Sequence, residues 1–113
     1  MNLKLLSKGN VLVFGDIILD RYISGSVDRV SPEAPVPVLK PSDEDIRLGG
    51  AANVAVNLSS LGSKVTLIGV TGKDVSSDQV RALLKQNKIR NALSKSVNPT
   101  ISKLRFLAGQ QQL

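Results

Sequence analysis

The segment Gly49-Gly50-Ala51-Ala52-Asn53 contains residue types that could hold a small polar ligand. Its two glycines have no side chain, so a ligand can come close to the backbone. If a helix begins here, its first turn offers unpaired N–H groups, and Asn53 adds an amide that donates and accepts hydrogen bonds. We therefore expect this segment to bind the hydroxyl groups of a polyhydroxylated molecule. The alternative is that the two glycines only form a turn into the helix and bind no ligand.

Asp16 is a second candidate, since it directly follows the apolar run of residues 11–15. That run predicts a buried strand of a parallel sheet, and ligands bind at the carboxyl ends of such strands. Asp16 could otherwise form a turn or cap a helix. Asp20 lies close by in the chain and could bind the same ligand, or it could pair with Arg21 or Arg47 on the surface.

The elements that must position these residues alternate between strand and helix. Residues 51–61 have apolar side chains at helical spacing. Val54, Leu58 and Leu61 are expected to face the core, with Ala51 and Ala55 beside them, and Gly62 is a natural helix end. The order strand, helix, strand implies a right-handed parallel crossover. An α/β core is therefore expected. Its elements are predicted as strand 11–15, helix 51–61, strand 64–70, a helix after Asp74 and a half-buried strand over 100–107.

Residues 17–48 are expected to form a β flap outside this core. The prolines at positions 32, 35 and 37 exclude a helix there and are tolerated only in edge strands or extended segments. Short strands are predicted over 22–27, around 36–39 and over 46–48, with a polar turn at 43–45.

The composition excludes several classes of protein. The 113 residues include no cysteine and no histidine, so disulfides and thiolate or imidazole metal sites are not available. The net charge is +6, but the basic residues are scattered and aromatic residues make up only 3%, so no nucleic-acid partner is expected. No apolar run approaches the roughly 20 residues of a membrane span. We expect a cytoplasmic protein without a membrane partner.

Four passages resemble the ribokinase-like (PfkB-type) sugar kinases. The Gly-Gly-x-x-Asn element of residues 49–53 is typical of the whole family. The Ser-Pro-Glu-Ala-Pro-Val-Pro run that begins at Ser31 is more specific and resembles the heptose 7-phosphate kinase branch, in which the kinase domain is fused to an adenylyltransferase. The four passages are residues 13–22, 29–38, 49–55 and 99–105.

The resemblance implies the N-terminal part of a three-layer α/β/α ribokinase-like domain with a protruding β lid. Residues 17–48 would be the lid, which covers the sugar and pairs with its copy in a homodimer, and the remainder of residues 1–113 would belong to the α/β core. The implied reaction transfers the γ-phosphoryl group of ATP, with Mg²⁺, to the anomeric hydroxyl of D-glycero-β-D-manno-heptose 7-phosphate. This is a step toward ADP-heptose for lipopolysaccharide.

The resemblance also implies roles for single residues. In the family, the acidic residue after the first strand and the Gly-Gly-x-x-Asn helix start hold sugar hydroxyls. The corresponding residues, with one further acidic candidate, are Asp16, Asp20, Gly49, Gly50 and Asn53. Lys103 and Arg105 are candidates for the phosphate end of the sugar, although cations on a strand more often face solvent.

The family's catalytic aspartate lies in a Gly-Ala-Gly-Asp motif, which this sequence does not contain. The nucleotide site and the fused adenylyltransferase are expected outside these residues as well. We therefore expect an N-terminal kinase segment that binds the sugar phosphate but binds neither ATP nor Mg²⁺ tightly. Marginal stability is also expected, because a sheet edge would be left unpaired. The alternative is a non-catalytic dimerisation or binding module that uses the β flap.

Overall fold

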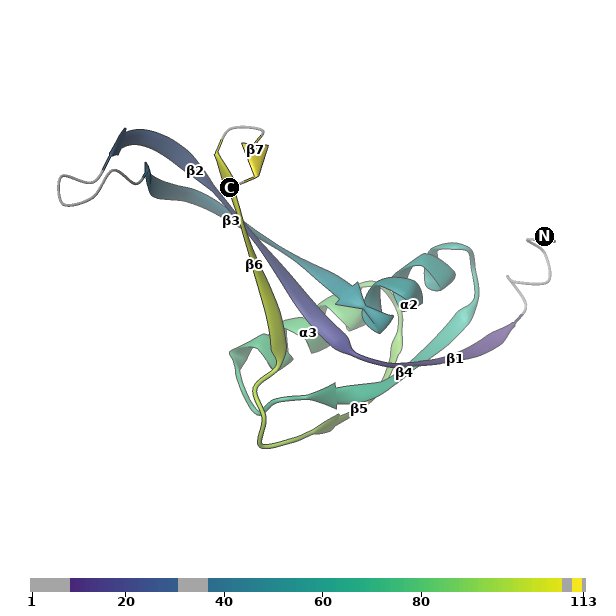
Figure 1. The fold of residues 1–113 in the computed structure, drawn as a ribbon. Coiled ribbons are helices and arrows are strands. Elements are labelled where there is room, and N and C mark those ends of the chain that lie inside the picture. The colour runs from purple at the N-terminus through teal and green to yellow at the C-terminus, as the bar shows by residue number, and fades with distance from the viewer. Residues whose placement is uncertain (1–8, 31–36, 109–110, 113) are drawn as a thin grey trace. The chain divides into compact units, whose positions relative to one another are not determined.

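The computed structural model describes residues 9–30, 37–108 and 111–112, which fall into two compact units. The core unit contains the described residues of Met1–Leu19 and Arg47–Ser102. The β unit contains those of Asp20–Ile46 and Lys103–Leu113. Strands and helices alternate in the core unit, as expected of an α/β fold (Figure 1).

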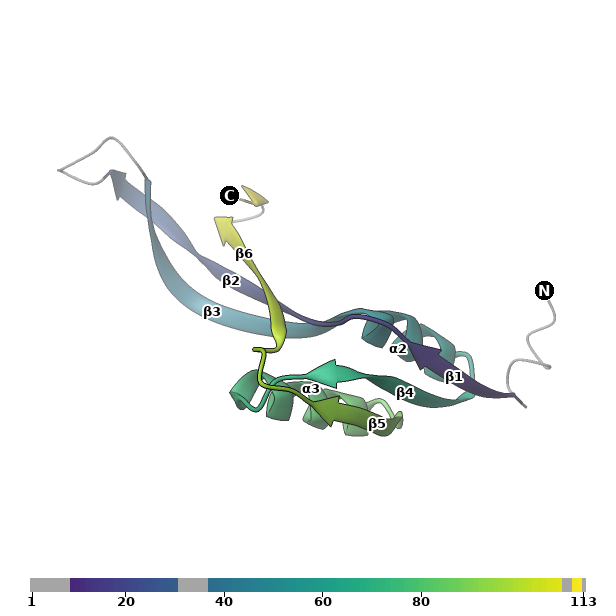
Figure 2. The same ribbon diagram turned by 60° about the horizontal axis from the view of Figure 1, so that its bottom comes forward.

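A three-stranded parallel sheet forms the centre of the core unit (Figures 1 and 2). Its strands, in spatial order, are β1 (Asn10–Phe14), β4 (Lys64–Thr71) and β5 (Arg90–Lys95). Because the strands are parallel, their carboxyl ends meet at one edge of the sheet. Ligands of open α/β sheets bind at that edge.

Two helices, α2 (Ala51–Ser60) and α3 (Val75–Gln86), lie on the same side of this sheet (Figure 1). Right-handed crossovers that proceed in one direction across a sheet place successive helices on one face. The buried apolar residues between helices and sheet are Ala52, Ala55, Val65, Leu67, Val80, Leu84 and Ile89. In the part of the chain that the structure describes, neither helix is long and apolar enough to span a bilayer.

The sequence predicts α2 to within one residue but predicts its buried face only in part. Ala55 is buried as expected and Leu58 is partly buried, whereas Val54 and Leu61 are exposed and Ala52 is fully buried in their place. Alanine side chains allow the helix to pack close to β1 and β4, so the small residues face the sheet and Val54 faces away from it.

The third strand of the core sheet is β5, which no apolar pattern predicts. Of its side chains only Leu93 is partly buried, so hydrophobic periodicity cannot mark the strand. The strand predicted over residues 100–107 exists as β6 (Ile101–Ala108). It pairs in the sheet of the β unit, and its predicted place as the third core strand is therefore wrong.

The β unit is built on a four-stranded sheet in the order β3-β2-β6-β7. Besides β6, the strands of this sheet are β2 (Ile17–Val30), β3 (Pro37–Gly50) and β7 (Gln111–Gln112). The start of β2, the end of β3 and the start of β6 belong to the core unit. Residues 31–36, which include most of the proline-rich run, lie outside the described residues.

The polar turn predicted at residues 43–45 is wrong, because β3 continues through these acidic residues. Glu44 pairs with Arg21 on β2, with 2.8 Å between the Arg21 guanidinium and a Glu44 carboxylate oxygen. A cross-strand partner of opposite charge stabilises an acidic residue within a sheet.

A hydrogen-bond network fixes the turn between β4 and α3. Asp74 caps α3, since its Oδ1 accepts the Ser77 N–H at 2.8 Å. The same carboxylate accepts the Thr100 hydroxyl at 2.7 Å and the Thr100 backbone N–H at 2.9 Å. The Thr100 hydroxyl oxygen in turn accepts the Gly72 N–H at 2.9 Å. One carboxylate therefore ties the start of α3 to the segment that precedes β6.

Replacing Asp74 with alanine should lower the free energy of unfolding by about 2–4 kcal/mol, because it removes the helix cap and leaves the Thr100 N–H without this partner. Asp78→Ala is the matched control. Asp78 is an exposed residue in the first turn of the same helix, where it contributes about 0.5 kcal/mol through the helix dipole. Urea denaturation followed by circular dichroism measures both variants. Equal losses would contradict the role given to Asp74.

Candidate functional site

A backbone hydrogen bond joins Asp16 to the start of α2. The Ala51 N–H donates to the Asp16 carbonyl oxygen at 2.9 Å. Gly50 precedes the helix with φ 61° and ψ −137°, a conformation that residues with side chains rarely adopt. A Cβ at Gly50 would collide with the same carbonyl oxygen. The glycine therefore permits the contact between the residue after β1 and the helix start.

The amino end of α2 has no side-chain cap, and its first turn contains no acidic residue. Asn53 lies in that turn with an exposed side chain, and Gly49 is buried just before the helix. The dipole and the remaining N–H groups of such a helix end favour hydroxyl oxygens or anions. This part of the site can therefore accept a hydroxylated ligand.

A hollow of about 390 Å³ lies at the carboxyl ends of β1 and β4. Asp16 lines it with an exposed side chain, together with Thr71, Ser96 and Asn98. The last three residues were not among the sequence candidates. Thr71 could have been found, because it follows the predicted strand over 64–70. Ser96 follows β5, so it is recognisable only once that strand is known.

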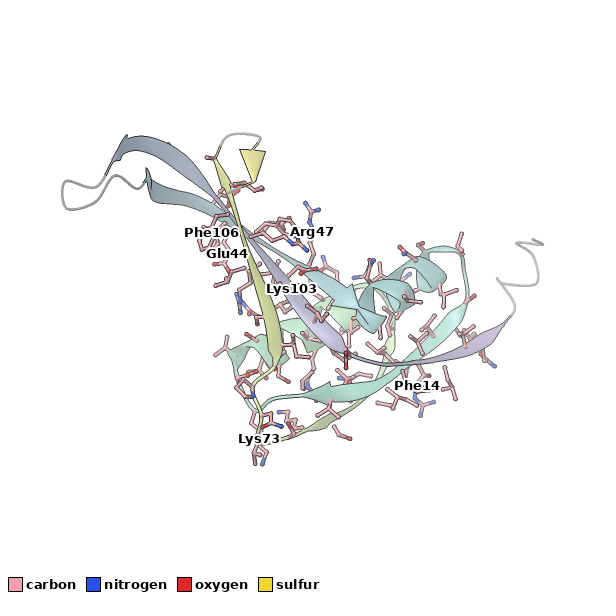
Figure 3. The ribbon with its side chains drawn as sticks, in the orientation of Figure 1. Phe14, Glu44, Arg47, Lys73, Lys103 and Phe106 are labelled. Atoms are coloured by element: carbon pink, nitrogen blue, oxygen red, sulfur yellow. The ribbon has the colours of Figure 1, made fainter. Side chains whose placement is uncertain are left out.

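Asp20, Lys103 and Arg105 belong to the β unit. Asp20 Oδ1 and Arg105 Nε are buried and have no hydrogen-bond partner among the described residues. The Arg105 guanidinium lies 5.8 Å from the centroid of the Tyr22 ring, and Lys103 is exposed (Figure 3). A buried polar atom without a partner destabilises the fold by about 1–3 kcal/mol and calls for an explanation such as a bound group.

The seven sequence candidates thus divide between the two units. The core unit brings together those that surround the start of α2, which are Asp16, Gly49, Gly50 and Asn53. Their chemistry is recognition of hydroxyl groups, since a carboxylate accepts hydrogen bonds, an amide does both and helix N–H groups donate them. Within the described ranges, no three acidic, histidine or cysteine side chains gather to hold a metal ion.

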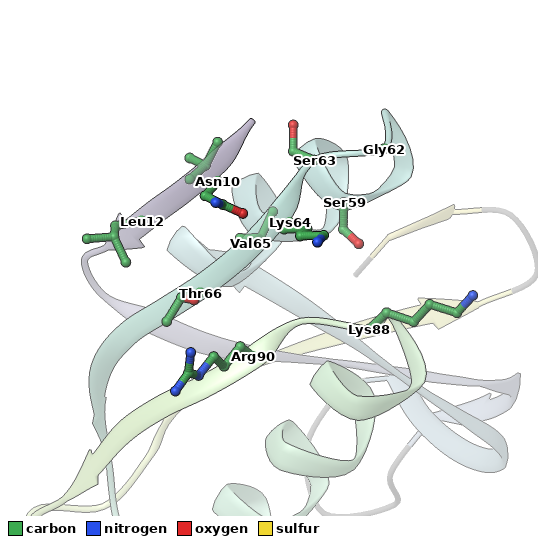
Figure 4. Close-up of a pocket in the computed structure, with 11 residues that line it drawn as sticks. Asn10, Leu12, Ser59, Gly62, Ser63, Lys64, Val65, Thr66, Lys88 and Arg90 are labelled. Carbon is green, nitrogen blue, oxygen red and sulfur yellow. The ribbon is translucent and has the colours of Figure 1, made fainter. Parts of the chain in front are cut away.

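A larger hollow, of about 800 Å³, lies at the opposite edge of the core sheet (Figure 4). The residues that begin the three strands, Asn10, Lys64 and Arg90, all line it. Ligands of open α/β sheets bind at the carboxyl ends of the strands. The hollow that contains Asp16 is therefore the better candidate for a substrate site. Of the sequence candidates only Asp16 lines it, and Gly49, Gly50 and Asn53 are not among its lining residues.

The pfkB carbohydrate kinase family matches residues 8–113 of the chain. The chain is 49% identical over its whole length to the bifunctional protein HldE of Hydrogenovibrio crunogenus, of which it covers 24%. It is 49% identical over 96% of its length to the D-beta-D-heptose 7-phosphate kinase of Bordetella bronchiseptica, of which it covers 35%. The chain therefore spans between 24% and 35% of the length of these two relatives.

Solved structures of sugar kinases share this fold. A carbohydrate kinase from Agrobacterium tumefaciens superposes with a TM-score of 0.72 at 26% identity, over 88% of this chain and 32% of that one. Ribokinase from Thermotoga maritima superposes with a TM-score of 0.68 at 18% identity, over 93% of this chain and 34% of that one. The predicted ribokinase-like α/β fold is confirmed.

Gly50→Ala should lower the free energy of unfolding by at least about 2 kcal/mol, because the new methyl group collides with the Asp16 carbonyl oxygen in a strained backbone conformation. Ser60→Ala changes an exposed residue at the other end of α2 and should stay within about 0.5 kcal/mol of the wild type. Chemical denaturation compares the two. A Gly50→Ala protein as stable as the Ser60→Ala protein would show that the helix start does not depend on this close contact.

Proposed function

Because the chain belongs to the pfkB family of carbohydrate kinases, we propose that it supplies the sugar-binding part of a kinase that phosphorylates heptose 7-phosphate. The proposed reaction moves the γ-phosphoryl group of ATP to the anomeric hydroxyl of D-glycero-β-D-manno-heptose 7-phosphate, on the way to ADP-heptose and lipopolysaccharide. The 49% identity with the Bordetella protein supports this choice of sugar. We place the reaction in the cytoplasm, where ATP is available.

The observation that best supports this proposal is the hydrogen bond from the Ala51 N–H to the Asp16 carbonyl oxygen. It holds the residue after β1 against the open start of α2. In the proposal, the Asp16 carboxylate accepts hydrogen bonds from sugar hydroxyls, and Asn53 and the backbone at Gly49 and Gly50 complete the contacts. A sugar hydroxyl both donates and accepts, so it needs both kinds of partner.

We further propose that residues 17–48 act as a lid and that Asp20, Lys103 and Arg105 contact the sugar phosphate from the β unit. The buried Asp20 Oδ1 and Arg105 Nε support this assignment, because they have no partner among the described residues. A sugar hydroxyl would satisfy the carboxylate oxygen, and a phosphate oxygen would satisfy the guanidinium nitrogen.

ATP and Mg²⁺ are implied for the complete kinase, and we propose that their sites lie outside these residues. The Gly-Ala-Gly-Asp motif is absent from the sequence, and the described side chains gather no metal-binding cluster. We propose that the nucleotide, the metal and the catalytic base bind to the remainder of the kinase, which the greater length of the relatives allows. The role proposed for this chain is to bind and orient the acceptor sugar.

Asp16→Asn should weaken the binding of heptose 7-phosphate at least about tenfold, because the carboxylate makes stronger, charge-assisted hydrogen bonds to hydroxyls than an amide does. Asp78→Asn is the matched control, since Asp78 is an exposed acidic residue of the same unit on α3. Isothermal titration calorimetry of the sugar phosphate into each protein measures the affinity. The proposed site is wrong if the wild type gives no heat, or if both variants bind as the wild type does.

The chain alone should show no magnesium-dependent ATP turnover with heptose 7-phosphate, because the proposed catalytic base lies outside it. A coupled assay of ADP release measures this, with the complete Bordetella kinase as the positive control. Turnover by the 113-residue chain would overturn the division of roles proposed here.

A dimerisation or binding module is the second candidate function, and exposed apolar residues of β6 favour it. Leu104 and Phe106 are 57% and 38% exposed, and their spacing places them on the same face of the strand. We propose that this face pairs with a second copy. Analytical ultracentrifugation that finds a concentration-dependent dimer, together with calorimetry that finds no sugar binding, would favour this function over the kinase role.

A further inference from the structure

The charges of the core unit are unevenly distributed between the two edges of its sheet. The acidic side chains among its described residues are Asp16, Asp74 and Asp78, which follow β1, follow β4 and lie in the first turn of α3. All of them therefore lie toward the carboxyl edge. Because α3 joins the parallel strands β4 and β5, it runs back to the amino edge, where the strands begin. The residues around the end of this helix are basic.

These basic residues surround a hollow of about 590 Å³ between α3 and the start of β5. Arg81 and Lys85 belong to α3, Lys88 lies in the turn after it, and Arg90 begins β5. We call these four residues the basic cluster. The other described residues that line the hollow are an isoleucine and an asparagine, so neither a carboxylate nor an aromatic ring is among them. Figure 4 shows Lys88 and Arg90 on either side of the short connection from α3 to β5.

The end of α3 does not need these cations to satisfy its backbone. Lysine and arginine side chains often bond to the last carbonyl groups of a helix. Here the carbonyl oxygens of residues 83–85 accept the backbone N–H groups of residues 87–89, and the Asn87 carbonyl oxygen accepts the Ser59 hydroxyl at 2.8 Å. The cluster is therefore not explained by helix capping.

The helix dipole and ion pairing do not explain the whole cluster either. The dipole favours cations only within the last turn, which includes Lys85 but not Arg81. Arg81 and Lys85 are one turn apart, a spacing at which like charges destabilise a helix. Arg81 Nε donates to the Ser77 hydroxyl at 3.3 Å. In the part of the chain that the structure describes, no carboxylate forms an ion pair with any residue of the cluster.

We propose that the basic cluster binds an anion that contains two or more linked phosphate groups. A guanidinium group can form two parallel hydrogen bonds to phosphate oxygens, and ammonium groups add point charges. A single phosphate would leave most of the four positive charges unneutralised, whereas the volume of the hollow is that of a small-molecule site. Nucleic acid fits less well, because no aromatic side chain lines the hollow to stack on its bases.

This site is separate from the proposed sugar site. The hollow that contains Asp16 lies at the carboxyl edge, and it shares no lining residue with the hollow of the basic cluster. The site also differs from the nucleotide site of a kinase, because it holds only phosphates, offers no partner to a base and needs no Mg²⁺. The inference depends on neither the identity of the sugar nor the proposed reaction.

Isothermal titration calorimetry of sodium tripolyphosphate into the complete 113-residue chain, without Mg²⁺, tests the proposal. The double variant Lys85→Gln/Arg90→Gln should weaken binding at least about tenfold, because it removes two of the four charges. Lys73→Gln/Lys95→Gln is the matched control. It removes the same charge from two exposed residues of the same unit that do not line the hollow, and its affinity should stay within about twofold of the wild type.

Three further titrations identify the chemistry of the ligand. Orthophosphate should bind at least about tenfold more weakly than tripolyphosphate, and ATP should bind about as well as tripolyphosphate, because the phosphates alone are held. Raising the salt concentration should weaken the binding of both. Two results would overturn the proposal: ATP that binds about tenfold more tightly than tripolyphosphate, or a short DNA duplex that binds more tightly than either and depends on Lys85 and Arg90.

Circular dichroism checks that each variant folds, and nuclear magnetic resonance of the wild-type chain gives a readout without substitutions. Tripolyphosphate should shift the amide signals of residues 85–91 most. An absence of heat with the wild type, equal affinities of the two double variants, or shifts concentrated around Asp16 would each contradict the proposal. None of these measurements uses the sugar, so their failure and a failure of the sugar site are separate results.

Discussion

The close contact between the end of β1 and the start of α2 is the constraint on which the candidate site depends. It exists because Gly50 has no side chain to collide with the Asp16 carbonyl oxygen, which accepts the Ala51 N–H. The main chain thus sets the position of the site, while Asp16 and Asn53 supply its side-chain groups. A carboxylate and the N–H groups of a helix start are groups that can recognise hydroxyls.

The core sheet has different chemistry at its two edges. Asp16 lies at the carboxyl edge, where ligands of α/β sheets bind, and Lys64, Lys88 and Arg90 lie around the hollow at the amino edge. Between the edges, the exposed side chains of β1 and β4 are apolar. The hollow that contains Asp16 is also lined by Phe14, Ile68 and Val70, so apolar side chains of the sheet border the candidate ligand site.

The sequence predicts those parts of the fold in which a run of apolar residues is bounded by a glycine. Strand β1 and helix α2 are predicted to within one residue because their apolar residues end near Gly15 and Gly62, and β4 because its apolar run begins just after Gly62. Strand β5 is missed because its pairing with β4, rather than burial of its side chains, positions it. The acidic residues around Glu44 suggest a turn, but the pairing of Glu44 with Arg21 across two strands is visible only in three dimensions.

Part of the candidate site can be recognised in the sequence. Asp16, Gly50 and Asn53 stand out by residue type and by their positions after a strand and at a helix start. Ser96 does not stand out, because it follows β5, which has no apolar pattern in the sequence. The sequence predicts a helix after Asp74, whereas the contacts of Asp74 with Thr100, 26 positions away, depend on the folded chain.

The most direct test of the central claim is a titration of the ¹⁵N-labelled chain with heptose 7-phosphate, followed by nuclear magnetic resonance. The largest shifts of amide signals are predicted for Asp16 and for residues 50–53 at the start of α2. Shifts concentrated instead around Lys64 and Arg90, or no shifts at any sugar concentration, would contradict it.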